Sequence, residues 1–246
     1  MRDRDLLAAV ADLLWPGRCA SCRTPLSHAS DRGLLRVLCP LCADAVLEVE
    51  PPACSRCGLP FAGAGADHLC AACLADPPEF VRARARFLWG GPLADAVVRF
   101  KYRDCPHLAG PLGALLEPLA FAAAKPDLVV PVPLHPRRLR SRGYNQSALL
   151  ARRVAKVAHA PLVTSLMARV LDTPRQAGLS RKDRMWNLTD AFAVPGARRW
   201  QGARVLLVDD VVTTTATIRV CSAALLAAGI GEVEVVSLVR AAGRAG

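Results

Sequence analysis

The spacing of apolar and polar residues predicts a parallel α/β domain over most of the chain. Residues 82–90 (RARARFLWG) alternate like a half-buried strand, and residues 92–102 carry apolar side chains at helical spacing. Apolar runs within 127–135, 205–208 and 233–239 are typical of strands that are buried on both faces of a parallel sheet. We therefore expect an α/β fold, with a parallel sheet flanked by helices.

The last two apolar runs enclose a strand, loop, helix and strand unit. A helix is expected over about 216–228, ended by Gly229, and a right-handed crossover should join the two strands. Another helix is expected after Asn145, whose side chain is a favourable N-cap. We assign residues 79–246 to this domain and expect the linker that precedes it at 75–79.

Residues 1–78 form a second, cysteine-rich domain. Eight of the ten cysteines fall into four CxxC pairs, a spacing that lets two thiolates converge on one zinc ion. The gaps of 16 and 12 residues favour two consecutive zinc ribbons, although a cross-braced arrangement of the first pair with the third stays open. A short helix is expected over 4–15. The expected ligands of two structural zinc ions are Cys19, Cys22, Cys39, Cys42, Cys54, Cys57, Cys70 and Cys73.

Disulfides are the competing chemistry for these cysteines. They need an oxidising compartment, and the apolar run near the N-terminus does not fit a secretory signal because Asp12 interrupts it. His68 could replace a zinc ligand, but a solvated loop histidine is the favoured interpretation. The two remaining cysteines, Cys105 and Cys221, are expected to be buried and inert.

Two adjacent carboxylates, Asp209 and Asp210, follow the run 205–208 and precede a threonine-rich loop. Ligands of open α/β sheets bind at the carboxyl ends of the strands, where these acids would accept hydrogen bonds from the vicinal diol of a ribose. The loop and the start of the next helix offer hydroxyls and backbone N–H groups to a phosphate. The alternative is that the aspartates only cap the helix. The candidate phosphate ligands are Thr213, Thr214, Thr215, Ala216 and Thr217.

Two basic segments could bind anions at the same edge of the sheet. Residues 137–142 hold four arginines directly after an apolar strand, which favours an anion-binding loop. Residues 172–192 read as a long, mobile, cationic loop that could close over a polyphosphate. The alternative for the first segment is a solvated turn or a nuclear-type address, and the alternative for the second is a surface strand pair with incidental charge. The candidate ligands are Arg137 and Arg142, and the candidate catalytic cations are Arg175, Arg181 and Lys182.

The net charge of +11 belongs to the larger domain, because residues 1–80 carry −3 and residues 81–246 carry +14. Such an excess favours anionic partners, either a phosphorylated small molecule or nucleic acid, although an arginine-rich composition without function is an equal alternative. No run approaches the roughly 20 apolar residues of a membrane-spanning helix. We expect a cytoplasmic protein with no membrane partner.

The motifs resemble known families. Residues 205–217 (VLLVDDVVTTTAT) are similar to the PRPP-binding motif of type I phosphoribosyltransferases, except that Thr215 stands where that loop has glycine. The CxxC pairs, followed by VPVPLHPRRLRSRGYNQ, RQAGLSRKDRMWN and this motif, closely resemble the ComF family of competence-associated proteins. The resemblance implies a type I phosphoribosyltransferase fold with an N-terminal zinc-ribbon module, and a role linked to DNA uptake or nucleotide salvage.

Two functions follow from the resemblance. A phosphoribosyltransferase would bind PRPP, or a related ribose phosphate, with Mg²⁺ and release pyrophosphate beside the basic segments. A non-catalytic protein would use the same cleft for single-stranded DNA or a nucleotide, beside a DNA-uptake helicase or recombination mediator. Aromatic residues make up only 5% of the chain, fewer than stacking-based binders use, although Tyr144 and Trp186 lie in the basic segments.

Overall fold

The computed structural model describes residues 17–26, 33–102, 105–171 and 191–241. The helix expected over 4–15 and residues 172–190 of the cationic segment lie outside these residues. The described helices are α2 (Pro40–Asp44), α3 (Ala71–Ala75), α4 (Gly91–Tyr102), α5 (Ala109–Ala114), α6 (Glu117–Ala122), α7 (Pro136–Arg142), α8 (Gln146–Ala158) and α10 (Ala216–Ala227), with 3₁₀ turns at Gly33–Arg36, Pro106–Leu108 and Ala197–Trp200. The strands are β1 (Arg82–Leu88), β2 (Leu128–Pro131), β3 (Ala168–Arg169), β4 (Phe192–Ala193), β5 (Arg204–Val212) and β6 (Glu232–Arg240).

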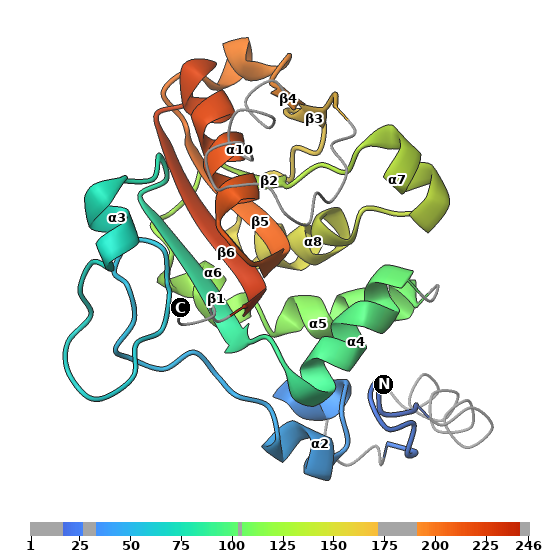
Figure 1. Cartoon of the computed structure of the whole chain (residues 1–246). Helices are drawn as coiled ribbons and strands as arrows, with labels where there is room; N and C mark the ends of the chain where they lie inside the picture. Colours follow the sequence, from blue (N-terminus) through green and yellow to red (C-terminus); the bar gives the residue numbers. More distant parts are fainter. Residues whose placement is uncertain (1–16, 27–32, 103–104, 172–190, 242–246) are drawn as a thin grey trace.

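A four-stranded parallel sheet of order β1-β6-β5-β2 lies at the centre of the molecule (Figure 1). Strand β5 pairs with β6 from Arg204, opposite Glu232, to Val212, opposite Arg240. The helix between them, α10, connects the two parallel strands. The predicted parallel sheet flanked by helices is therefore confirmed. A separate antiparallel pair, β3 with β4, brackets the cationic segment in sequence.

Alternate residues of β5 enter two different cores, because strand side chains alternate between the faces of a sheet. Leu206 and Val208 pack in the core that holds Phe100 of α4 and residues of α5 and α8. Val205 and Leu207 pack in the core that α10 covers. Figure 1 shows α10 and α8 on opposite faces of the sheet. Both faces are thus buried, as the continuous apolar runs indicated.

Two elements differ from the expectation. Strand β5 does not end before the acids but includes Asp209 and Asp210, because its pairing with β6 continues through Asp209 opposite Ser237. Strand β2 is shorter than the apolar run around it and ends at Pro131. Proline has no N–H to donate to a ladder, and Pro131 and Pro133 limit the pairing here.

The four-arginine segment is a helix, α7, and not the loop that we expected. Pro136 stands in its first turn, and the ring nitrogen of His135 accepts a hydrogen bond from the Arg137 N–H at 3.3 Å. Gly143 ends the helix with φ of 80°, in the left-handed region that glycine adopts without strain. Proline at the start and glycine at the end are the usual boundaries of a helix, so the sequence did contain this signal.

Both cysteine-rich segments pack against the sheet domain. Cys19 and Cys39 belong to the same core as Phe100, and Figure 1 shows α2 beside α4. Cys54 belongs to the core on the opposite face of the sheet. Gly58 has φ of 66°, and a Cβ there would lie 2.6 Å from the carbonyl oxygen of Ala83 in β1. The backbone of the second cysteine-rich segment therefore lies directly against the backbone of β1 at Gly58. None of the described helices is long and apolar enough to cross a membrane.

Candidate functional site

The eight CxxC cysteines form two Cys₄ clusters. Within each cluster all four sulfur atoms lie within 4.8 Å of one another. Zinc–sulfur bonds of about 2.3 Å in a tetrahedron place the sulfurs about 3.8 Å apart. The separations of 3.6 Å between Cys22 and Cys39 and 3.8 Å between Cys57 and Cys70 agree with that edge. The first cluster is Cys19, Cys22, Cys39 and Cys42, and the second is Cys54, Cys57, Cys70 and Cys73.

These clusters confirm the sequential pairing of the CxxC motifs and contradict the cross-braced alternative. The described cysteines are free thiols, so the disulfide alternative does not apply to them. Burial raises the pKa of Cys57 to about 11, and charge repulsion from Cys54 contributes to the shift. Because Cys57 stays protonated near neutral pH without a cation, four thiolates together need one, and the donor set fits a structural zinc ion.

The other cysteines and the histidine lie apart from the two clusters. His68 stacks on Phe61 with ring centroids 4.1 Å apart, and is not part of the second cluster, as expected. Cys221 is fully buried, and burial raises its pKa well above the usual value, which fits the prediction of an inert thiol. Cys105 is only half-buried, so the prediction of burial was wrong for this residue.

The two acids of β5 are buried and contact different helices. The carboxylate of Asp209 accepts a hydrogen bond from the Ser147 hydroxyl of α8 at 3.0 Å. The carboxylate of Asp210 lies 2.8 Å from the Lys101 ammonium of α4. This contact is an ion pair rather than a hydrogen bond, since Asp210 Oδ2 has no aligned donor. A ribose diol would therefore have to replace or join existing partners of these oxygens.

Lys101 is a site residue that the sequence reasoning missed. Its side chain is only 12% exposed, although lysine is rarely buried unless it is paired. The signal was present in the sequence: Lys101 follows Val97 by four residues, which places it on the apolar face of the helix predicted over 92–102. A lysine on the apolar face of an amphipathic helix indicates a buried anionic partner.

Burial and the neighbouring charge of Asp210 raise the pKa of Asp209 to about 7, and the Lys101 ammonium and the Ser147 hydrogen bond offset only part of this shift. The carboxyl therefore titrates near neutral pH. A group poised in this way changes its charge when a cation or a diol binds beside it, because a nearby positive charge favours the ionised form.

The threonine loop, residues 213–217, follows β5 and leads into α10. Thr213 and Thr214 are exposed, and the first turn of α10 contains no acidic residue. Thr215 is the N-cap residue of α10, but its side chain makes no capping hydrogen bond. Its φ of 60° lies in the left-handed region, which costs a β-branched residue on the order of 1–3 kcal/mol. This is the position at which the PRPP-binding motif that residues 205–217 resemble has glycine.

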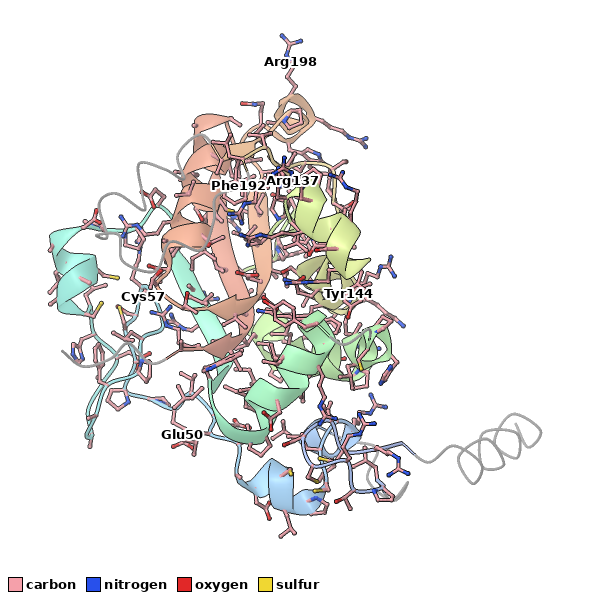
Figure 2. The ribbon with its side chains drawn as sticks, turned by 45° about the vertical axis from the view of Figure 1, so that its right-hand side comes forward. Glu50, Cys57, Arg137, Tyr144, Phe192 and Arg198 are labelled. Atoms are coloured by element: carbon pink, nitrogen blue, oxygen red, sulfur yellow. The ribbon has the colours of Figure 1, made fainter. Side chains whose placement is uncertain are left out.

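One arginine of α7, Arg142, reaches toward α4. The Arg142 guanidinium lies 4.8 Å from the ring centroid of Tyr102, the residue after Lys101, and donates a hydrogen bond to Gln146 at 2.5 Å. Arg142 is thereby connected to the Lys101–Asp210 pair through α4. Figure 2 shows Arg137 and Tyr144 on the side of the sheet to which α7 belongs. The Tyr144 hydroxyl donates to the Phe100 carbonyl, so this ring packs inside rather than facing a ligand.

The structure brings together only part of the predicted site. Asp209, Asp210 and the threonine loop lie together at the end of β5, whereas Arg142 contacts Tyr102 of α4 and Gln146 of α8. The proposed catalytic cations Arg175, Arg181 and Lys182, and the aromatic Trp186, lie outside the described residues. A mainly apolar cavity of about 430 Å³ lies between residues 161–166 and 196–200, and none of the predicted site residues lines it.

Zinc content tests the pairing of the clusters. We expect two zinc ions per chain, measured by inductively coupled plasma mass spectrometry. Because Cys22 and Cys39 share one cluster, the double variant Cys22→Ser/Cys39→Ser should retain one zinc ion. The double variant Cys22→Ser/Cys54→Ser disrupts both clusters and should retain none. Equal zinc content in the two variants would contradict the sequential pairing.

The Asp209 pKa predicts a pH dependence of stability. The folded-state pKa of about 7 exceeds the ordinary value of 3.8, so the native state binds more protons between these values, and stability falls as pH rises through this window. Asparagine keeps the acceptor oxygen but cannot ionise. Urea denaturation at pH 5–8 should therefore find Asp209→Asn increasingly more stable than wild type, by at most about 4 kcal/mol. The exposed control Asp44→Asn should parallel wild type, and a constant difference for Asp209→Asn would contradict the shift.

Comparison with known proteins agrees with this organisation. Residues 10–74 match the family model described as double zinc ribbon domain. The chain is 34% identical over 233 residues to competence protein F of Haemophilus influenzae, which covers 91% of this chain and 97% of that protein. It is 33% identical over 232 residues to DNA utilization protein YhgH of Escherichia coli K12, with 92% and 97% covered.

Solved structures overlap with this chain less extensively. A purine phosphoribosyltransferase from Pyrococcus horikoshii aligns with a TM-score of 0.31 and 15% identity, over 55% of this chain and 80% of that one. A hypoxanthine phosphoribosyltransferase from Staphylococcus aureus aligns with a TM-score of 0.34 and 16% identity, over 57% and 65%. The family assignment rests instead on the relatives that match along nearly the whole chain. On this basis, the chain belongs to the competence protein F (ComF) family.

Proposed function

We propose that the end of β5 and the threonine loop bind the 5-phosphoribosyl group of PRPP or a related ribose phosphate. The observation that carries this proposal is the buried acid pair Asp209 and Asp210, placed directly before an exposed threonine loop at the start of a 12-residue helix. Carboxylates hold hydroxyl groups, and a loop of hydroxyl and N–H donors at a helix N-terminus holds phosphate. The order of the two matches the order of diol and phosphate on a ribose 5-phosphate.

Each group has a defined role in this proposal. Asp209 and Asp210 accept hydrogen bonds from the ribose hydroxyls, and the threonine loop, including the Ala216 backbone, binds the 5-phosphate. Lys101 compensates the charge of the acids while the site is empty and yields to the ligand. Arg137, Arg142, Arg175, Arg181 and Lys182 are the proposed partners of the pyrophosphate group.

Glycosyl transfer at this site would need no protein nucleophile. Positive charge develops on the anomeric carbon and negative charge on the leaving pyrophosphate, so fixed charges and positioning supply the rate. Mg²⁺, when bound with PRPP, would neutralise part of the pyrophosphate charge. The cellular context that we propose is DNA uptake or nucleotide salvage in the cytoplasm. The names of the relatives, competence protein F and DNA utilization protein, support the first of these.

A second candidate function is a non-catalytic protein that binds single-stranded DNA or a nucleotide beside a DNA-uptake helicase or recombination mediator. Tyr102 favours it, because the residue is 58% exposed and the Arg142 guanidinium lies against its ring. Base stacking on such a pair is tolerant of sequence. Binding to the DNA backbone should weaken steeply with salt, whereas a compact ribose-phosphate site should be less sensitive.

Calorimetric titration with PRPP and Mg²⁺ tests the first proposal. We expect wild type to bind with a Kd on the order of micromolar. The double variant Asp209→Asn/Asp210→Asn should lose binding, since the amides halve the acceptors and cannot balance Lys101. The exposed control Asp44→Asn should bind like wild type. Absence of binding by a folded, zinc-loaded wild type would refute the proposal and leave the DNA-binding candidate.

Thr215→Gly should raise both the stability of the protein and its affinity for PRPP. Glycine adopts a φ of 60° without strain, so relief of the strain at Thr215, partly offset by the greater chain entropy of unfolded glycine, should raise stability by about 1 kcal/mol. The removed side chain also lets backbone approach phosphate more closely. Thermal denaturation and PRPP titration should both report the gain. A loss of stability would mean that Thr215 does not hold the left-handed conformation in solution.

A further inference from the structure

The threonine loop contains a strained residue that its surroundings must hold in place. Thr215 has φ of 60° and ψ of −10°, a conformation that a β-branched residue adopts only when neighbouring structure imposes it. The contacts at the two ends of the loop therefore decide its shape. One end is the first turn of α10, and the other is the last residue of β5, Val212.

The helix end of the loop is held by Arg219. This residue is 4% exposed, and its backbone N–H donates to the Thr215 carbonyl at 2.9 Å. Its guanidinium donates to the carbonyl oxygens of Asp76 at 2.9 Å and Pro77 at 3.5 Å. It also pairs with the Asp76 carboxylate at 2.9 Å and faces Glu79 at 3.7 Å. One buried fork thus connects α10 to the segment 76–79.

That segment is the direct continuation of the second Cys₄ cluster. Cys70 is the N-cap of α3, Cys73 lies within α3, and the Asp76 N–H closes the helix on the Ala72 carbonyl at 3.1 Å. A helix of five residues does not persist by its own hydrogen bonds. The position of Asp76 therefore depends on a metal that draws Cys70 and Cys73 together with the other two ligands.

The strand end of the loop reaches the same cluster through Arg240. Arg240 pairs with Val212 in the sheet and is 5% exposed, and the next residue donates to the Val212 carbonyl at 2.9 Å. Its Nη2 lies 3.9 Å from the sulfur of Cys57, while its Nε and Nη1 have no hydrogen-bond partner among the described residues. Zinc with four thiolates carries a net negative charge, which this buried guanidinium compensates.

We infer that Arg219 is a positioning residue through which the second Cys₄ cluster holds the threonine loop in shape for a ribose phosphate. The ligand in this inference rests on the proposed function. The first cluster supports a different element: Arg99 of α4 donates to the Ser21 carbonyl at 2.9 Å, and the Ser21 hydroxyl donates to Asp95 at 2.8 Å. The two zinc centres therefore support opposite walls of one site.

Arg219→Lys tests the inference because lysine keeps the charge but cannot serve three acceptors with a planar fork. The matched control is Arg86→Lys. Arg86 pairs with the half-exposed Glu48 at 2.9 Å, and Glu48 lies between the two clusters in sequence. Three quantities are measured on the full chain: zinc content, amide hydrogen exchange over residues 213–218, and the Kd of ribose 5-phosphate. We expect two zinc ions in both variants. In Arg219→Lys alone, exchange should be roughly tenfold faster and binding roughly tenfold weaker.

A second variant covers the case in which Arg219→Lys fails to fold. Asp76→Asn/Glu79→Gln removes the two carboxylates that face Arg219 and leaves the backbone acceptors, and the Asp76 side chain is 54% exposed. It should accelerate exchange in the same amides to a smaller extent. Unchanged exchange in the folded variants overturns the inference. If wild type does not bind ribose 5-phosphate, the proposed function fails, while the exchange data still decide whether Arg219 positions the loop.

Discussion

The candidate site depends on burying two carboxylates at the end of one parallel strand. A buried charge without a partner is costly, so Asp209 and Asp210 require groups that other elements supply. Ser147 of α8 serves the first and Lys101 of α4 serves the second. Two of the helices that surround the sheet therefore do more than cover it, because they carry the groups that compensate the cost of burying the two acids.

The cysteine-rich segments are part of the same arrangement. The first cluster packs into the core that contains Phe100 of α4, the helix that carries Lys101. The second packs into the core on the other side of the sheet, where α10 begins at Thr215. Structural zinc supplies folding energy that short segments lack. In this protein the two clusters pack in the same cores as α4 and α10, the helices next to the candidate site.

The proposed function implies an exchange of partners at the buried acids. The Lys101–Asp210 pair is nearly dry, and breaking such a pair without replacement would leave an uncompensated charge. A ligand that brings hydroxyl donors and an accompanying cation would replace the Lys101 contact that it displaces from Asp210. The same reasoning disfavours a purely apolar ligand at this position, since it would bury the acids without serving them.

Most of the architecture followed from local pattern. The apolar runs predicted the parallel sheet, the position of α10 and the end of that helix near Gly229, because the spacing of apolar residues along the chain differs between strands and helices. The CxxC spacing predicted four ligand pairs, because the two cysteines of each pair are only three residues apart. It favoured sequential pairing, and the tertiary structure decided between that pairing and the cross-braced alternative. The helical nature of α7 could also have been predicted from Pro136 and Gly143, and the length of β5 could not, since it depends on continued pairing with β6.

The partners of the site were decided only by tertiary structure. Lys101 and Asp210 are separated by more than a hundred residues, as are Arg219 and Asp76, and no local pattern connects them. The conformation of Thr215 is likewise imposed by contacts at both ends of its loop rather than by its own preference. The sequence alone thus determined most of the elements, the eight candidate cysteine ligands and the acidic and basic residues of the candidate site. Packing determined which buried charges meet, because that depends on how the faces of the sheet are filled.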